Sequence, residues 1–404
     1  MLAEKTLEKY LSEEGRYPEN IAFYWQSSDI MWADGEGMAQ IMYLLGARPL
    51  WEGGRVKGFE VIPLRELRRP RIDVAIRVSG ITRDNFPCRI ELLDEAIQAV
   101  AQLDEPLEMN FVRKHTLERL GEVSFREATY RIFCSMPGVY GAGTQLAVYA
   151  SAWKEERDLA DVFLCWNGYA YGKGTFGQKA HGSLRAVLRT VELTFNKTVT
   201  DEYDLFGCCC YFGTHGGLIN AARVVSGKEV KSYYGDTREQ GEVQVRTLAD
   251  EIRRVVRAKL LNPRWIEGMK AHGYKGAGDI SKRVGRVYGW QATSREVDGW
   301  VFDEIARTYL MNEENRRFFE ENNPYALEEI ARRLIEAQGR GLWEPAPDVK
   351  EALKEIYVEI EGWIEERMGE VKGDFQGGAI DIVTAQHVEG WRQRMEETLG
   401  EDAR

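Results

Sequence analysis

The side chains best suited to chemistry lie in one segment of the 404-residue chain, residues 203–222 (YDLFGCCCYFGTHGGLINAA). Three adjacent cysteines, Cys208, Cys209 and Cys210, are followed five residues later by His215. Thiolate sulfur and imidazole nitrogen are ligands that bind first-row transition metals. We therefore interpret this segment as a candidate metal-handling site, presented in a turn-rich loop before an apolar helix.

Three glycines, Gly213, Gly216 and Gly217, surround the histidine. Glycine allows either a close approach of the backbone to a bulky group or a positive φ in a tight turn, and the sequence leaves both possibilities open. The spacing is not that of a zinc finger, because no second Cys-x-x-Cys or histidine pair completes four ligands. A structural role, with the cysteines as small core residues, is the alternative interpretation.

Composition excludes several classes of protein. The net charge of −11 argues against a nucleic-acid partner, which usually requires a basic face. Six cysteines, three of them adjacent, do not form a secreted disulfide framework, so a reducing compartment is expected. No signal-peptide pattern and no apolar run of transmembrane length occurs. We expect a soluble, cytoplasmic protein with no membrane partner.

Hydrophobic patterning predicts an α/β fold, with a parallel sheet and covering helices in the N-terminal part and a mostly helical C-terminal region. The expected strands are residues 21–25, 61–64, 73–78 and 162–166. The expected helices are residues 2–11, 35–45, 90–101, 184–195, 245–260, 300–309, 324–337 and 349–368, with a loop at 373–378. The length suggests two or three domains, and we place them at residues 1–110, 111–262 and 263–404.

A glycine-rich stretch imitates a dinucleotide-binding fingerprint. Gly172, Gly174 and Gly177 have the required spacing, and Glu192 follows at about the distance of a ribose-binding acid. However, Glu192 falls inside an expected helix rather than at the end of a second strand, which breaks the strand-helix-strand unit. A nicotinamide-dependent oxidoreductase is therefore kept only as a rival interpretation. The same expected helix would direct His181 and Glu192 toward a cleft beside the core.

Nucleotide hydrolysis is not expected from this chain. No Gly-Lys-Ser/Thr ending of a phosphate-binding loop occurs, so any ATP must be hydrolysed by another chain.

Several strings, in their order along the chain, resemble one family. They include LLGARPLW (44–51), RPRIDVAIRVSGITRDNFP (69–87), DEPLEMNFVRKH (104–115) and GWQAT (289–293). They also include the long stretch VRTLADEIRRVVRAKLLNPRWIEGMKAHGYKGAGDIS (245–281). Together they resemble the C-terminal portion of the large subunit of the ATP-dependent tetrapyrrole metal chelatases, which include cobaltochelatase CobN and the magnesium chelatase H subunit.

The resemblance implies metal insertion into a corrin-type or porphyrin-type macrocycle. It implies an AAA+ ATPase subunit and an integrin-like subunit as partners that use ATP, and it allows a separate chain to supply the N-terminal part. The segment matching residues 208–217 is the family's proposed chelation site, where acidic residues usually precede a His-Gly-Gly. Here cysteines replace the acids. Because Mg²⁺ prefers oxygen ligands, Co²⁺ is the expected ion, with Ni²⁺ or Mg²⁺ as alternatives.

Insertion must remove two pyrrole N–H protons and deliver a partly dehydrated cation. We expect His215 to be the base or a metal ligand, Cys210 a transient ligand ahead of Cys209, and Glu192 a helper.

Four further side chains are expected to bind the macrocycle. They are Tyr171, Tyr211, Arg83 and His181. Tyr169 and Phe212 are additional candidates for stacking. The remaining alternative is a tetrapyrrole-binding or carrier protein that does not insert metal.

Overall fold

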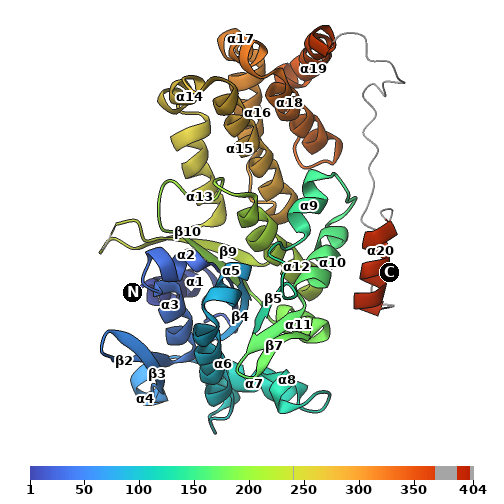
Figure 1. The fold of residues 1–404 in the computed structure, drawn as a ribbon. Helices are drawn as coiled ribbons and strands as arrows, with labels where there is room; N and C mark the ends of the chain where they lie inside the picture. Colours follow the sequence, from blue (N-terminus) through green and yellow to red (C-terminus); the bar gives the residue numbers. More distant parts are fainter. Residues whose placement is uncertain (240, 369–388, 401–404) are drawn as a thin grey trace.

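The structure is a computed structural model that describes residues 1–239, 241–368 and 389–400, and its centre is an eight-stranded sheet (Figure 1). The strand order is β10 (Gln244–Thr247), β9 (Lys231–Asp236), β8 (Leu193–Thr198), β1 (Asn20–Trp25), β4 (Asp73–Val78), β5 (Ile132–Cys134), β6 (Tyr169–Gly172) and β7 (Thr175–Lys179). The five central strands, from β9 to β5, are parallel, whereas β10, β6 and β7 pair antiparallel at the two edges. The predicted α/β fold with a parallel sheet is confirmed.

Helices cover both faces of the sheet. Alternate side chains of each strand point to opposite faces and pack against the two helical layers. Ile21 and Phe23 of β1 pack in one core cluster with α1 (Leu2–Glu14), α3 (Glu36–Leu45) and α6 (Pro87–Ala101). Ala22 packs on the other face with α10 (Glu156–Asn167), α11 (His181–Leu188) and α12 (Gly217–Ser226). The carboxyl ends of the parallel strands therefore lie together between two helical layers. We call this side of the sheet its carboxyl edge.

The C-terminal part is helical, as expected, and forms the upper half of the view in Figure 1. It contains α13 (Leu248–Val255), η3 (Val256–Leu260), α14 (Pro263–Lys270), α15 (Gly273–Ser294), α16 (Gly299–Ile305), η4 (Ala306–Met311), α17 (Glu313–Asn322), α18 (Pro324–Gly339) and α19 (Pro347–Met368). The last described helix, α20 (Glu389–Leu399), packs against α10. None of the helices in the described ranges is long and apolar enough to span a bilayer.

Shorter elements connect these layers. They are α2 (Ser27–Trp32), the hairpin β2 (Ala47–Glu52) and β3 (Arg55–Val61), α4 (Leu64–Leu67), α5 (Gly80–Asn85), η1 (Leu107–Met109), α7 (Phe111–Arg119), α8 (Phe125–Ala128), α9 (Thr144–Tyr149) and the π-helical turn η2 (Tyr211–Gly216). The predicted loop at residues 373–378 lies outside the described residues.

Four expectations of secondary structure are wrong. The helix expected at 245–260 begins only at Leu248, because Val245 belongs to the edge strand β10. Residues 162–166 belong to α10, because a capping box between Glu155 and Asp158 starts a helix that includes this apolar run. Residues 61–64 are not a strand, since β3 ends at Val61 and α4 starts at Leu64. The helix expected at 184–195 stops at Leu188, and its last apolar residues instead form β8.

The glycine fingerprint is part of a β-hairpin. Gly172 and Gly174 lie at the turn between β6 and β7, and Gly177 lies within β7. No helix follows the first strand of this motif, so the dinucleotide-binding interpretation is wrong. The sheet also contains strands from both sides of residue 110, so it is continuous across that expected boundary.

Candidate metal and macrocycle site

The three cysteines form a cluster of sulfur atoms at the edge of the sheet where the parallel strands end. Their Sγ atoms lie within 4.8 Å of one another, and they are the only group of three or more potential metal-binding side chains found in the described part of the chain. Cys210 is exposed, whereas Cys208 and Cys209 are partly buried. The backbone N–H of Cys210 donates to the Cys208 sulfur at 3.3 Å. Three sulfur atoms at this spacing can converge on one soft cation.

Hydrogen bonding within the cluster concentrates negative charge on one sulfur. The thiols of Cys209 and Cys210 donate to Cys208 and hold the pKa of Cys208 well below its usual range, helped by the nearby Arg286. The same interactions raise the pKa of Cys209 and of Cys210. The lowered pKa favours Cys208 over its two neighbours as the thiolate, which is the form of cysteine that binds metals. This ranking differs from the sequence expectation, which favoured Cys210 for its proximity to His215.

Helix α15 holds the segment that leads into the cysteines. Asp204 is buried and accepts from Arg283 at 3.0 Å, forms an ion pair with Lys259, and accepts the Phe206 N–H at 2.8 Å. The carbonyl of Phe206 accepts from Arg286 at 2.5 Å. Cationic side chains therefore hold the backbone around Asp204 and Phe206, immediately before the cysteine cluster.

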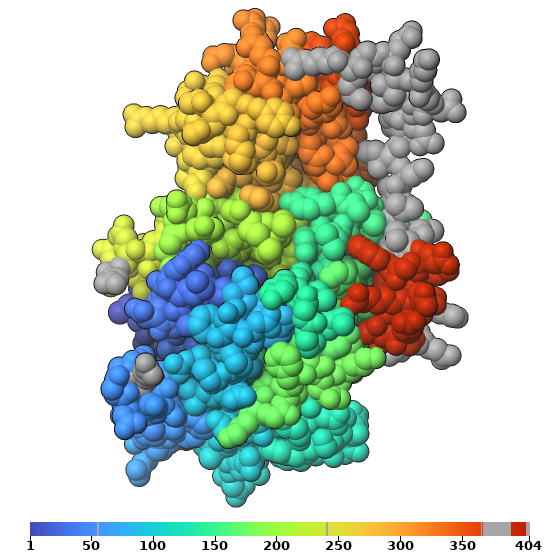
Figure 2. All heavy atoms as spheres, in the orientation of Figure 1, coloured from blue at the N-terminus to red at the C-terminus, as the bar shows by residue number. Residues whose placement is uncertain are grey.

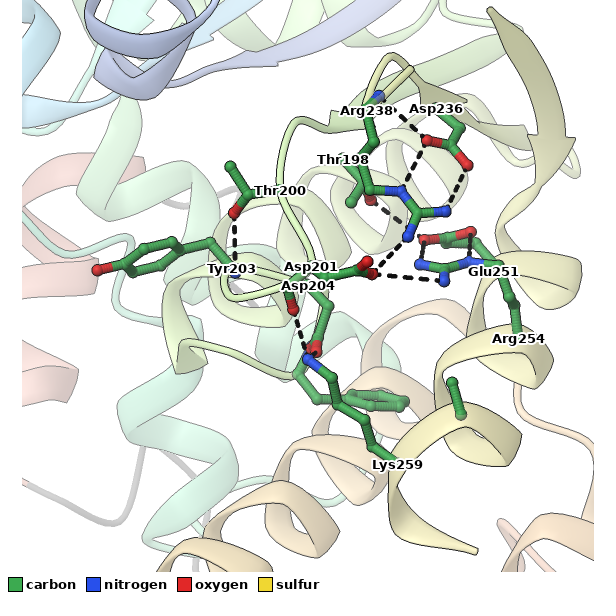
Figure 3. Close-up of polar contacts among 12 residues, drawn as sticks. Thr198, Thr200, Asp201, Tyr203, Asp204, Asp236, Arg238, Glu251, Arg254 and Lys259 are labelled. Atoms are coloured by element: carbon green, nitrogen blue, oxygen red, sulfur yellow. Dashed lines mark hydrogen bonds and ion pairs between the residues drawn. The ribbon is translucent and has the colours of Figure 1, made fainter. Parts of the chain in front are cut away.

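A second ionic network holds the start of this segment. Figure 3 shows Asp201 facing the guanidinium groups of Arg238 and Arg254, with Glu251 bound to Arg254. Glu251 also accepts from Thr198, the last residue of β8, at 3.1 Å. The loop is thus tied to both the sheet and the helical part, and the cysteines occupy a defined position rather than a free loop.

His215 is completely buried, with 0% of its surface exposed. Its Nε2 lies 3.1 Å from the Thr194 hydroxyl, its ring packs against Tyr234 and Trp290, and its Nδ1 has no hydrogen-bond partner in the described structure. Burial lowers the pKa of His215 to about 3, so the imidazole is neutral. The expectation of a loop histidine is wrong, because residues 211–216 form the π-helical turn η2. The His215 nitrogens are not part of the three-sulfur group.

The glycines around His215 allow close packing rather than unusual backbone conformations. Gly216 and Gly217 have φ values of −60° and −59°. A Cβ added to Gly216 would lie 2.2 Å from the Thr293 hydroxyl oxygen, and one added to Gly217 would lie 2.8 Å from the Phe163 ring. Of the two possibilities left by the sequence, close approach is the correct one. It brings η2 against α15.

We expect Gly216→Ala to destabilise the protein by about 1–3 kcal/mol, because the added methyl group overlaps a Thr293 side chain fixed on α15. Urea unfolding measures this change. Gly182→Ala in α11 is the matched control, since nothing lies within 4 Å of the added atom there. Equal stability of the two variants would contradict the close packing of η2 on α15.

Two tyrosines border the cluster. The Tyr211 hydroxyl donates to the Tyr203 carbonyl at 3.2 Å, and burial raises the pKa of Tyr211, with the neighbouring cysteines adding to the effect. Tyr24, at the carboxyl end of β1, hydrogen-bonds Thr214, and burial raises its pKa, with further contributions from Cys210 and Cys208. Tyr24 also lines a small cleft between β1, β8 and α2. Sequence reasoning found Tyr211 but missed Tyr24, which lies far from the cysteines along the chain.

Arg83 and Tyr171 lie together but not with the cysteines. Arg83 is buried, pairs with Asp84 at 2.6 Å and donates to three main-chain carbonyls of the loop after β5. Tyr171 donates to the Ser135 carbonyl at 2.7 Å. Both line a separate cleft with about 490 Å³ of empty space, next to β7. Arg83, in the segment after β4, and Tyr171, in β6, both bind main-chain carbonyls of the loop after β5.

The structure places the other two expected site residues elsewhere. His181 Nε2 lies 3.0 Å from the Cys165 carbonyl, and burial lowers the pKa of His181. Glu192 lies just before β8, at the opposite edge of the sheet from the cysteines. Its carboxylate accepts from both Arg16 Nη atoms at 2.7–2.8 Å and from the Glu19 N–H. These contacts connect elements of the fold.

Comparison with known proteins agrees with this architecture. The family pattern described as CobN/Magnesium Chelatase matches residues 1–350. An uncharacterized protein of Methanocaldococcus jannaschii is 66% identical over 95% of this chain and 31% of its own length. The aerobic cobaltochelatase subunit CobN of Pseudomonas aeruginosa is 39% identical over 88% of this chain and 29% of its own length.

A solved structure, the catalytic subunit of cobaltochelatase from Mycobacterium tuberculosis, superposes with a TM-score of 0.87 at 38% identity. The match covers 89% of this chain and 31% of that structure. The chain thus spans about a third of the length of these relatives. The match of one family pattern to most of the chain, together with these identities, shows that this protein belongs to the CobN/magnesium chelatase family.

Proposed function

We propose that this chain is the part of a tetrapyrrole chelatase large subunit that holds the metal ion for insertion, and that the ion is Co²⁺. The observation that carries the proposal is the group of three sulfur atoms within 4.8 Å at the carboxyl edge of a parallel sheet. Ligands of open α/β sheets bind at this edge. Thiolates favour a soft or borderline cation over Mg²⁺, which requires oxygen ligands.

The residues around the cluster suit a transient ligand site. Arg286 and the Cys210 N–H stabilise a thiolate on Cys208 before metal arrives. The exposed Cys210 gives the incoming ion access, and the anchored backbone from Asp204 to Phe206 keeps the three sulfur atoms together. Partial exposure leaves coordination positions for water and for the macrocycle nitrogens, so the ion can pass on. A role for His215 as base or metal ligand stays a prediction. Its imidazole is neutral, but complete burial and a pKa of about 3 make it a weak base toward a group outside the core.

We further propose that metal insertion and ATP hydrolysis are carried out by different subunits, as the family resemblance implies. A tetrapyrrole is the second substrate, and an AAA+ ATPase subunit and an integrin-like subunit use ATP to drive insertion. The remainder of the large subunit completes the macrocycle cavity.

Cobalt titration of the purified chain tests this proposal. We expect a thiolate-to-Co(II) charge-transfer band in the near ultraviolet. Loss of an outer-shell partner typically weakens metal binding about 10–100-fold, so Cys208→Ser, which removes a ligand, should weaken it at least as much. We expect smaller effects from Cys209→Ser and Cys210→Ser, because the interactions within the cluster raise the pKa of both thiols. Mg²⁺ in excess should not compete.

Cys88→Ser is the matched control, since Cys88 is an exposed free cysteine outside the cluster. A cobalt spectrum without a thiolate band, or one that is unchanged when all three cluster cysteines are replaced, would refute the metal site. Porphyrin binding without any cobalt binding would instead favour a carrier function.

A further inference from the structure

The aromatic side chains expected to stack on a macrocycle are not available to do so. Tyr169, Tyr171, Tyr211 and Phe212 are all buried in the core clusters. Phe212 packs edge-on against Tyr149, and the hydroxyls of Tyr171 and Tyr211 bind main-chain carbonyls. A flat ligand at the carboxyl edge of the sheet would need other rings.

Two exposed aromatic residues lie together at this edge. Trp32 ends α2, which follows β1, and Tyr203 lies in the loop that follows β8. Their side chains are 50% and 48% exposed, and their ring centroids are 4.9 Å apart with an interplanar angle of 39°. In Figure 3 the Tyr203 ring points away from the ionic contacts of Asp201 and Asp204. The backbone of this loop is therefore fixed from one side while the ring projects from the other.

The aromatic pair is continuous with the cysteine cluster. Tyr203 accepts the Tyr211 hydroxyl through its carbonyl, and Tyr211 in turn lies close to Cys208 and Cys210. Trp32 is the last residue of α2, and α2 begins two residues after the end of β1, the strand that carries Tyr24. The loop that carries Tyr203 is therefore joined through Tyr211 to the segment that carries the three sulfur atoms.

The surrounding surface is also apolar. Exposed large hydrophobic residues occur in the segments that follow the central parallel strands; these are Met31, Ile81, Met136, Tyr140 and Leu146. Figure 2 shows the blue, light-blue, teal and green segments that contain such connections meeting across the middle of one face. Exposed apolar side chains therefore occur in several of the connections at this edge, in addition to the aromatic pair.

We propose that Trp32 and Tyr203 form an aromatic wall that binds one face of the tetrapyrrole ring system and holds it beside the three sulfur atoms. The inference rests on the proposed function and identifies substrate-binding residues for it. A conjugated macrocycle is flat, apolar and wider than either ring, so the exposed face of one ring can stack on it while the tilted second ring contacts it at an angle. The cysteine cluster at the border of the wall would then approach the macrocycle from its edge.

Titration of the chain with a water-soluble, metal-free porphyrin tests the wall. An aromatic contact contributes about 0.5–1.5 kcal/mol beyond its buried area, so Trp32→Ala and Tyr203→Ala should each raise the Kd roughly 3- to 10-fold. Trp32→Phe and Tyr203→Phe keep a ring and should stay near the wild-type value. Tyr274→Ala and Tyr325→Ala are matched controls, because both tyrosines are exposed but belong to the helical part.

Thermal melts of all six variants accompany the titration, and Co(II) binding is measured in parallel. The wall is supported if the porphyrin Kd rises only for Trp32→Ala and Tyr203→Ala, while the melting temperatures and the cobalt band stay unchanged. Equal Kd values for wall and control variants overturn it, as does a wild-type chain with no porphyrin affinity. Absence of the cobalt band overturns the metal site separately, since the porphyrin comparison does not depend on it.

Discussion

Replacing Asp204 with alanine should lower the free energy of unfolding by about 3 kcal/mol, because it leaves two cations near the core without their anion. Asp204 is almost completely buried and binds both Arg283 and Lys259. It also accepts the Phe206 N–H, so the turn before the cysteines loses a hydrogen bond as well. Because this turn positions the three sulfur atoms, Asp204→Ala should also weaken Co(II) binding, although it removes no ligand. Urea unfolding and cobalt titration measure the two effects.

The control for this prediction lies on α15 itself. Asp279 forms a pair with Lys275 on the surface of the helix, and exposed pairs contribute only about 0–1 kcal/mol. Asp279→Ala should therefore leave both stability and cobalt affinity nearly unchanged. If Asp204→Ala lost stability but bound cobalt like the wild type, the ionic contacts would support the fold without positioning the cysteines.

Acid should destabilise this protein through His215. Burial holds the folded-state pKa at about 3, whereas an exposed histidine has a pKa of 6.5. Between these two values the unfolded chain binds a proton that the folded chain does not. The free energy of unfolding therefore falls as the pH drops from 6.5 toward 3, and His215 alone should remove about 2 kcal/mol by pH 5.

Comparison with His215→Gln separates this contribution from the other titrating groups. Glutamine does not titrate, so the variant should lose less stability than the wild type between pH 7.5 and pH 5, even if it starts from a lower value. Asp161, whose pKa is raised to about 6 by burial, titrates in both proteins and cancels in the difference. Parallel curves for the two proteins would show that His215 is not held neutral in the folded state.

The sequence predicted a helix or strand correctly where its short-range pattern and its surroundings in the fold favour the same secondary structure. The run Asp73–Val78 is rich in β-branched residues, and it becomes the fully buried strand β4 at the predicted bounds. Gly15 and Gly46 end helices α1 and α3 with φ values of 70° and 77°. Where an apolar run was short, the pattern could not separate helix from strand, and residues 162–166 were assigned wrongly for that reason.

The candidate metal-binding segment was recognised from local sequence alone, because three adjacent cysteines are unusual in any fold. Its partners were not found. Arg286, Trp32 and Tyr24 lie 76 or more residues from Cys210 along the chain, and no local pattern links them to it. Conversely, Glu192 was selected for its sequence spacing, and the structure uses its carboxylate to bind Arg16 at the opposite edge of the sheet.

The sequence by itself therefore determined the α/β class, the family resemblance and the segment that could bind a soft metal, since each depends on residue types and their order. Only the tertiary structure decided that His215 is sealed in the core, that Cys208 carries the most stabilised thiolate, and that Trp32 lies beside Tyr203. These properties depend on burial, on hydrogen-bond geometry and on which strand ends share an edge. They arise only when distant segments pack together, because solvent exclusion and short contacts do not exist in the extended chain.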